Sequence, residues 1–146
     1  KPIVLGGWVY PQKETGVILA QGGEGQGYSL YLQAGAPVFA VRSSGTLKQL
    51  VGPKIPLEKW THLVVVLAAD GTGTLYLDGK PAGKPAKLHL VSSQPADNLN
   101  LGADAGSLVG DYDNPLPFVG KLEDVWLYWG TLRSKLIPAW SKPPGE

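Results

Sequence analysis

The sequence predicts an all-β fold, an antiparallel sandwich or jelly roll. Short apolar runs alternate with glycine- and proline-rich turns along most of the chain, and the periodicity of an amphipathic helix is almost absent. At the centre, an unbroken aliphatic run at residues 63–67 is followed by turn residues and a second apolar run. Many short strands with regular turns are typical of β-sandwiches, so we expect two packed antiparallel sheets.

Five strands are expected before the centre of the chain. The first, residues 3–10, contains the pair Gly6 and Gly7, which indicates a β-bulge because glycine inside a strand often marks a local irregularity. The others are residues 17–21, 28–33, 37–42 and 46–51. A glycine-rich loop at 22–27 separates the second strand from the third.

Residues 60–79 specify three antiparallel strands in succession. The β-branched run at 63–67 fits a pleated surface and is too short for a typical helix. Residues 70–73, Asp-Gly-Thr-Gly, provide the positive backbone angles of a tight reversal, and residues 74–77 return as the next strand. The Asp-Gly pair at 78–79 is a second hairpin signal.

The second half of the chain is less regular. Residues 80–87 are a segment of proline, glycine and lysine. The remaining expectations are short strands at 88–91 and 99–101, a long irregular segment at 103–117, a strand at 118–129, a helical turn at 131–137 and a tail at 138–146.

Composition narrows the class of protein. The chain of 146 residues is the size of one domain, which we assign to residues 1–146. A net charge of +1 with scattered basic residues argues against a nucleic-acid partner, which needs a basic stripe. No apolar run reaches the roughly 20 residues of a membrane span. The lack of cysteine excludes disulfides, thiolate metal sites and thiol catalysis.

The order and spacing of several motifs resemble the laminin G-like, concanavalin A-like jelly roll. They are Trp60 to His62, Leu75 to Gly79, Leu101-Gly102 and Phe118 to Tyr128, within a match from about Trp8 to Leu136. Three further stretches are similar to the non-catalytic C-terminal domains of secreted bacterial sulfatases and polysaccharide-degrading enzymes: 16–22, 27–32 and 102–112. The resemblance implies two curved sheets, carbohydrate recognition, a parent catalytic domain in the same polypeptide, and a secreted or periplasmic location.

One departure from that family concerns the strand that usually precedes the segment equivalent to Trp8. This chain has almost nothing there. Either the chain is cut from a longer protein at this point, or the sheet edge is closed another way, for instance by the C-terminal tail. An unpaired edge strand would favour dimerisation.

The residue pattern does not indicate an enzyme. His62 and His89 are the only histidines, and no serine lies in a Gly-x-Ser-x-Gly elbow, so a hydrolase triad is not supported. Glu123 and Asp124 are adjacent on one strand and are expected on opposite faces, whereas glycoside hydrolysis needs facing carboxylates. We expect His62 to be a hydrogen-bonded structural residue.

Aromatic residues are the first candidates for ligand binding, because sugar rings pack their C–H groups on flat aromatic faces. The candidates are Trp126, Tyr128, Trp129 and Trp140. If Val125 and Leu127 face the core, the first two face outward, while the strand end and the tail expose the others. The alternative is that these rings cover a sheet edge or pack against a catalytic domain. Trp8, Phe39 and Trp60 are assigned to the core.

Polar candidates lie in the glycine loop and on the fourth strand. Glu24 and Gln26 are placed to hydrogen-bond sugar hydroxyls. Arg42, with the scattered lysines, is placed to meet a sulfated or uronic polymer. The alternative for the lysines is a solubilising role on strand ends.

Calcium is the candidate cofactor. Asp104, Asp111 and Asp113 lie close together in the long irregular segment, and calcium takes several oxygen ligands. The alternative is that these residues form turns, which aspartate favours.

Two functions follow from these features. The first is a non-catalytic carbohydrate-binding module that holds a polysaccharide near a sulfatase or glycoside hydrolase. The second is a structural or protein-interaction domain that packs on its parent enzyme and binds no sugar. Exposure of the candidate aromatics discriminates between them.

Overall fold

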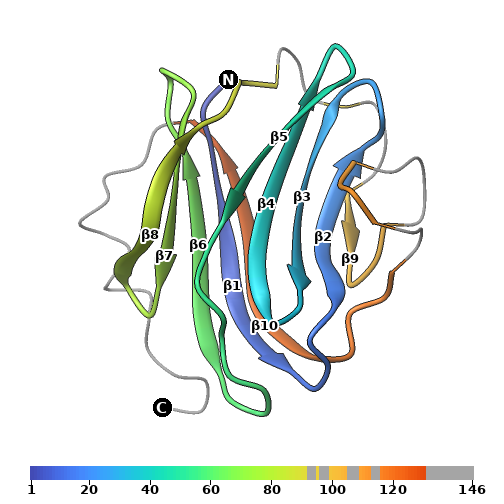
Figure 1. The fold of residues 1–146 in the computed structure, drawn as a ribbon, viewed down its shortest axis with the longest axis vertical. Coiled ribbons are helices and arrows are strands. Elements are labelled where there is room, and N and C mark those ends of the chain that lie inside the picture. The colour runs from blue at the N-terminus through green and yellow to red at the C-terminus, as the bar shows by residue number, and fades with distance from the viewer. Residues whose placement is uncertain (92–94, 96–98, 105–108, 113–115, 131–146) are drawn as a thin grey trace.

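The computed structural model describes residues 1–91, 95, 99–104, 109–112 and 116–130. Within these residues the chain forms two layers of antiparallel strands (Figure 1). The strands are β1 (Ile3–Pro11), β2 (Gly16–Gly22), β3 (Gly27–Gln33), β4 (Ala36–Ser43), β5 (Thr46–Val51), β6 (Thr61–Leu67), β7 (Thr72–Leu77), β8 (Lys80–Lys87), β9 (Asn100–Leu101) and β10 (Gly120–Trp129). Two packed antiparallel sheets confirm the predicted all-β sandwich.

Each sheet contains five of the described strands. The first has the order β10-β1-β6-β7-β8, and the second has the order β5-β4-β3-β2-β9. The three-stranded meander β6-β7-β8 is the one that residues 60–79 predict. Its register pairs Leu63 with Leu77 and Val65 with Leu75, so aliphatic side chains meet on the inner face.

The core lies between the two sheets. Inward-facing side chains of both layers form one cluster of buried residues, including Leu5 and Leu63 from the first sheet and Leu30 and Phe39 from the second. Tyr28 also belongs to this cluster. Alternation along the strands places these residues inward, and removing their apolar area from water stabilises the sandwich.

A bulge interrupts the pairing of β1 with β10. The register shifts between Gly6 and Trp8, and Asp124 on the facing strand has a positive φ of 51°. A Cβ at Gly7 would lie 2.9 Å from the Cα of Val125. Only glycine fits this close approach of the two backbones, which confirms the bulge predicted at the glycine pair.

The sequence did not predict strand bounds within residues 80–87, and it predicted a strand at 88–91. Residues 80–87 form β8, the third strand of the meander, and 88–91 do not form a strand, so the second expectation is wrong. β8 is an edge strand, where Pro81 and Pro85 are tolerated because a missing N–H removes no bond from a sheet interior. Leu88 and Val91 are instead buried in the core as irregular chain, and the Leu88 N–H donates to the carbonyl of Gly71 at 2.8 Å.

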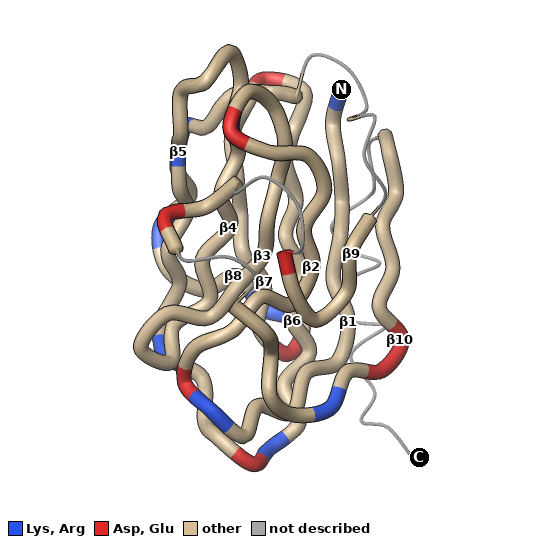
Figure 2. Tube along the Cα trace, turned by 90° about the vertical axis from the view of Figure 1, so that its right-hand side faces the viewer, with Lys and Arg blue, Asp and Glu red and all other residues tan. Residues whose placement is uncertain are grey.

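The segment around Trp8 is not a sheet edge. β1 lies between β10 and β6. β10 thus occupies the position beside β1 for which the resemblance to the family left no strand. In Figure 2, Lys and Arg segments lie beside Asp and Glu segments, and the described residues form no single basic stripe on the face in view. No helix in the described part of the chain is long and apolar enough to cross a bilayer.

Candidate functional site

A loop covers the outer face of the second sheet. The β9–β10 loop spans residues 102–119, of which the structure describes 102–104, 109–112 and 116–119. Its backbone follows β2: the Gly102 N–H donates to the Ile18 carbonyl at 2.7 Å, and the Val17 N–H donates to the Leu116 carbonyl at 2.9 Å. The loop therefore lies along the sheet as a second layer over its outward side chains.

Polar side chains of the sheet fasten this loop. The Asp104 carboxylate is buried, at 1% exposure, and its Oδ2 accepts bonds from the Val109 N–H at 3.2 Å and from the Tyr112 hydroxyl. The Tyr112 hydroxyl has one proton, and it uses this proton to donate a hydrogen bond to the carboxylate. Ser29 therefore donates to Tyr112 across the 2.9 Å between their oxygens. Burial, reinforced by the bond to Asp104, raises the pKa of Tyr112 and keeps its hydroxyl protonated.

Arg42 fastens the same loop. Its Nε donates to the carbonyl of Val109, and one terminal nitrogen donates to the carbonyl of Gly45 at 3.3 Å. The sequence suggests this guanidinium as a ligand for anionic sugar. The structure places it between the β9–β10 loop and the turn that follows β4.

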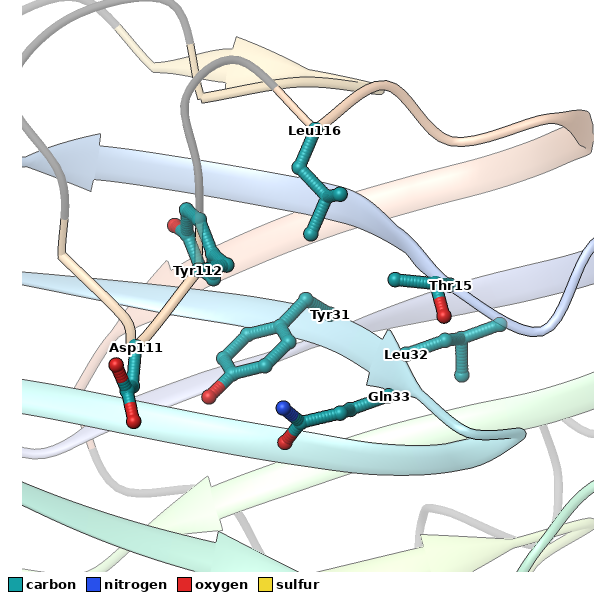
Figure 3. Close-up of a pocket in the computed structure, with 7 residues that line it drawn as sticks. All are labelled: Thr15, Tyr31, Leu32, Gln33, Asp111, Tyr112 and Leu116. Carbon is teal, nitrogen blue, oxygen red and sulfur yellow. The ribbon is translucent and has the colours of Figure 1, made fainter.

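Beside these anchors lies a pocket of about 220 Å³. The side chains that line it come from the β1–β2 turn, the end of β3 and the loop: Thr15, Tyr31, Leu32, Gln33, Asp111, Tyr112 and Leu116 (Figure 3). In Figure 3 the hydroxyl of Tyr31 lies between the carboxylate of Asp111 and the amide of Gln33. Three exposed polar side chains, those of Thr15, Gln33 and Asp111, thus surround a concavity with apolar walls.

The floor of the pocket is rigid. Tyr31 is 0% exposed, packs edge-on against Tyr112 with ring centroids 4.8 Å apart, and accepts a bond from Gln49 Nε2 at 2.8 Å. Burial raises the pKa of Tyr31, so its hydroxyl stays neutral. A ring with no exposed face offers no stacking surface. The chemistry available at the mouth is therefore hydrogen bonding by the polar side chains.

The structure separates the candidate aromatics of β10. Val125 and Leu127 pack on the core, as predicted, and the two rings beside them face outward. Tyr128 is 51% exposed, whereas Trp126 is half-buried and packs on the cluster of Val4 and Val64.

The last two aromatic candidates do not join this outward pair. Trp129 is half-buried, packs on the core cluster and meets Tyr28 edge-on, with ring centroids 5.8 Å apart. Trp140 lies outside the described residues. Among the candidate rings that the structure describes, only that of Tyr128 has more than a third of its surface exposed to water.

Trp60 is not a core residue, although the sequence assigns it there. It is half-buried and packs against Tyr10, with ring centroids 5.4 Å apart. Lys121 places its Nζ 4.8 Å from the centre of the Tyr10 ring. Trp8 and Phe39 are buried, as expected. Trp60 lies just before β6, so strand alternation does not predict to which side its ring points.

His62 is buried, in agreement with the structural role expected for it. Its ring packs on Trp8 with centroids 5.0 Å apart, and its backbone N–H donates to Asp78 Oδ1 at 2.9 Å. The ring Nδ1 has no hydrogen-bond partner among the described residues. Burial lowers the pKa of His62, and the nearby Asp78 opposes that shift only in part.

The glycine loop and Asp104 do not line the pocket, whereas Asp111 does. Glu24 is exposed and Gln26 half-buried in the loop between β2 and β3, and the Gly23 N–H donates to the Gln26 carbonyl at 3.0 Å. Asp104 is turned into the loop interior, and Asp113 lies outside the described residues. The described residues contain no group of three or more acidic, histidine or cysteine side chains arranged to hold a metal ion. The calcium site suggested by the sequence includes Asp113 and stays a prediction.

Two facing antiparallel sheets, with a loop-built pocket on the outside of one of them, define a lectin-like β-sandwich. A family model described as the concanavalin A-like lectin/glucanases superfamily matches residues 5–137. The chain belongs to this family, which confirms the resemblance seen in its motifs. No curated protein matches the chain in a sequence search.

Solved structures share the same fold. A heptameric SAP-like pentraxin from Limulus polyphemus has 18% identity and a TM-score of 0.70, covering 97% of this chain and 70% of that one. The CBM40 of an IT-sialidase from Ruminococcus gnavus, bound to α2,3 sialyllactose, has 16% identity and a TM-score of 0.72, with coverages of 97% and 82%.

A third match is domain 4 of AbnA, a GH43 extracellular arabinanase from Geobacillus stearothermophilus, in complex with arabinotriose. It has 21% identity and a TM-score of 0.69, and this chain covers 66% of it while 97% of this chain is covered. At such identities the likeness establishes the fold alone.

The sequence pattern missed most of the pocket. Asp111 is the one candidate residue that lines it, and it was selected as a metal ligand. The alternation of β3 contained a usable signal, because Ser29, Tyr31 and Gln33 interrupt an apolar strand at every second position. All three side chains serve the site: Ser29 bonds to the loop, Tyr31 forms the floor and Gln33 lines the mouth.

Proposed function

We propose that this domain is a non-catalytic carbohydrate-binding module, which holds a polysaccharide near a sulfatase or glycoside hydrolase of the same secreted polypeptide. The observation that carries the proposal is the pocket beside the β9–β10 loop, where Thr15, Gln33 and Asp111 converge around apolar walls. Convergent hydrogen-bonding groups on a preformed concavity are typical of ligand sites. Two structural neighbours that hold sugars in their solved complexes support it.

Tethering explains why a shallow pocket is sufficient. The volume of about 220 Å³ is below the ~300–1,000 Å³ usual for drug-sized ligands, so the site takes a small part of a long polymer. A module linked to a catalytic domain raises the local concentration of substrate, so weak binding by each copy is useful.

Affinity electrophoresis in gels containing neutral or sulfated polysaccharides tests the proposal. We expect retardation by at least one polymer and a loss of retardation in Gln33→Ala. Glu123→Gln, an exposed substitution on the other sheet, is the control and should migrate like the wild type. Retardation by none of the polymers would contradict the module.

A second function, packing on a parent enzyme, is favoured by the outer face of the first sheet. There the ring of Tyr128 is 51% exposed, next to a cluster in which Val4 and Val64 are buried and Trp126 is half-buried. Tyrosine is enriched at protein interfaces, because its ring is apolar and its hydroxyl is polar. If Tyr128→Ala abolishes association with the parent catalytic domain while Gln33→Ala does not, this second function is supported.

A further inference from the structure

The charge of the pocket restricts the sugars that it accepts. Of its seven lining residues, Asp111 alone carries a formal charge at neutral pH, because the threonine, glutamine, leucines and tyrosines that complete the lining are neutral there. Asp111 is exposed at the mouth. A ligand that enters therefore meets a negative group.

The nearest cations do not line the pocket. Arg42 carries a positive charge close enough to act on Tyr31, but two of its nitrogens donate to the carbonyls of Val109 and Gly45 outside the lining. Beyond the pocket, the side chains of Lys54 and Glu14 approach the turn at Gly35 and carry opposite charges. Asp111 is therefore the one charged group among the lining residues that a ligand in the pocket contacts directly.

Hydrogen-bond chemistry leads to the same restriction. An ionised carboxylate only accepts hydrogen bonds, so its partner on the ligand must donate. Sugar hydroxyls donate, and two adjacent hydroxyls match the two oxygens of one carboxylate. Sulfate esters and uronate carboxylates carry oxygens without protons at neutral pH, so they cannot donate to Asp111.

We propose that this pocket binds one neutral sugar ring through adjacent hydroxyls held by Asp111 and the Gln33 amide, and that it rejects sulfated and uronic rings. The inference rests on the proposed carbohydrate-binding function. It differs from the expectation that Arg42 and the lysines receive an anionic polymer.

The test compares matched polymers on the whole chain: dextran and dextran sulfate, and a neutral galactan and its sulfated form, in affinity gels at physiological salt. At least one neutral polymer should bind. Its sulfated form should bind roughly fivefold or more weakly, which is the effect of two like charges about 4 Å apart in water.

Two variants assign the selectivity to the pocket. Asp111→Asn keeps the shape of the side chain and should weaken neutral binding about tenfold while narrowing the gap between neutral and sulfated polymers. Gln33→Glu adds a second negative charge and should widen the gap. Glu123→Gln removes one charge elsewhere on the surface and should leave the gap unchanged.

The outcomes separate the two proposals. A preference for sulfated polymers that Asp111→Asn leaves unaltered would overturn the neutral-sugar inference and leave the binding module standing. Binding to none of the polymers would overturn the module itself. A neutral preference that disappears in Asp111→Asn, with thermal unfolding like that of the wild type, supports the inference.

Discussion

The hydroxyls of Ser29 on β3 and Tyr112 in the β9–β10 loop lie 2.9 Å apart, although 83 residues separate them in the chain. This contact continues to Asp104, whose carboxylate accepts a hydrogen bond from the Tyr112 hydroxyl. The pocket depends on it, because Tyr112 and Asp111 are wall residues and stand on a loop that has no sheet partner of its own at that point. Docking of the loop therefore forms the site.

Removing the Tyr112 hydroxyl tests this dependence. Tyr112→Phe leaves the buried carboxylate of Asp104 without one donor and Ser29 without its acceptor, so we expect a loss of about 1–3 kcal/mol in the free energy of unfolding. Urea denaturation measures the change. Tyr128→Phe removes the same atom from a ring that is 51% exposed and should change stability by less than about 0.5 kcal/mol. Equal losses in the two variants would show that the hydroxyl is not an anchor.

The close approach of Gly6 on β1 to the backbone of β6 predicts a second result. A Cβ at Gly6 would lie 2.3 Å from the carbonyl oxygen of Leu63, which is sheet backbone and cannot give way cheaply. Gly6→Ala should therefore destabilise the domain by about 1–3 kcal/mol or more. In Gly25→Ala the added carbon meets nothing within 4 Å, so the thermal midpoint should stay close to that of the wild type. The idea fails if both alanine variants unfold at the same temperature.

Core burial predicts a third result. Leu30 is buried between the sheets, and Leu30→Ala should cost about 2–5 kcal/mol through lost apolar contact and the cavity left behind. Leu101→Ala makes the same chemical change at a side chain that is 56% exposed and should be nearly neutral. Chemical denaturation of both variants under one set of conditions compares them. A small loss at Leu30 would mean that the two sheets do not meet there.

The buried histidine predicts a pH dependence. Burial lowers the pKa of His62 below its ordinary value of 6.5, so the unfolded chain binds the proton more readily than the folded chain. The stability is therefore complete above about pH 6.5 and decreases as the pH falls below that value. Free energies of unfolding measured from about pH 7.5 down to about pH 5.5 give the slope of stability against pH.

Substitution of His62 tests whether this residue causes the dependence of stability on pH. His62→Phe keeps an aromatic ring against Trp8 and removes the titrating nitrogen, so the decrease between neutral and mildly acidic pH should become shallower. His89→Gln is the control, because His62 is unchanged in it and the slope should remain. An unchanged slope in His62→Phe would mean that another group controls the dependence.

Local chemistry in the sequence was sufficient for the central meander and the bulge. The aliphatic run of β6, the Asp-Gly turns after it and the glycine pair of β1 act on neighbours within a few residues or on the facing backbone. The same local reasoning signalled a third strand after Asp78-Gly79 but did not give the bounds of β8, because its two prolines are compatible with a strand only once β8 is known to be an edge.

The pocket could not be predicted from local sequence patterns. Sequence alternation places Tyr31 and Gln33 on the outer face of β3, but that face is solvent until another segment covers it. Whether Asp111 faces a metal ion, water or a tyrosine depends on how the β9–β10 loop docks. Arg42 shows the same effect, since two of its nitrogens donate to backbone carbonyls, one in the loop and one in the next turn.

The sequence by itself determined the sandwich, the strands of its centre and the inward or outward face of residues such as Leu127 and Tyr128. Tertiary structure alone decided that Trp129 meets Tyr28, that Asp104 is sealed inside the loop and that Asp111 stands at the mouth of a pocket. The physical reason is range. Strand alternation and turn geometry are short-range backbone properties, whereas these contacts depend on the packing of segments that are distant in the chain.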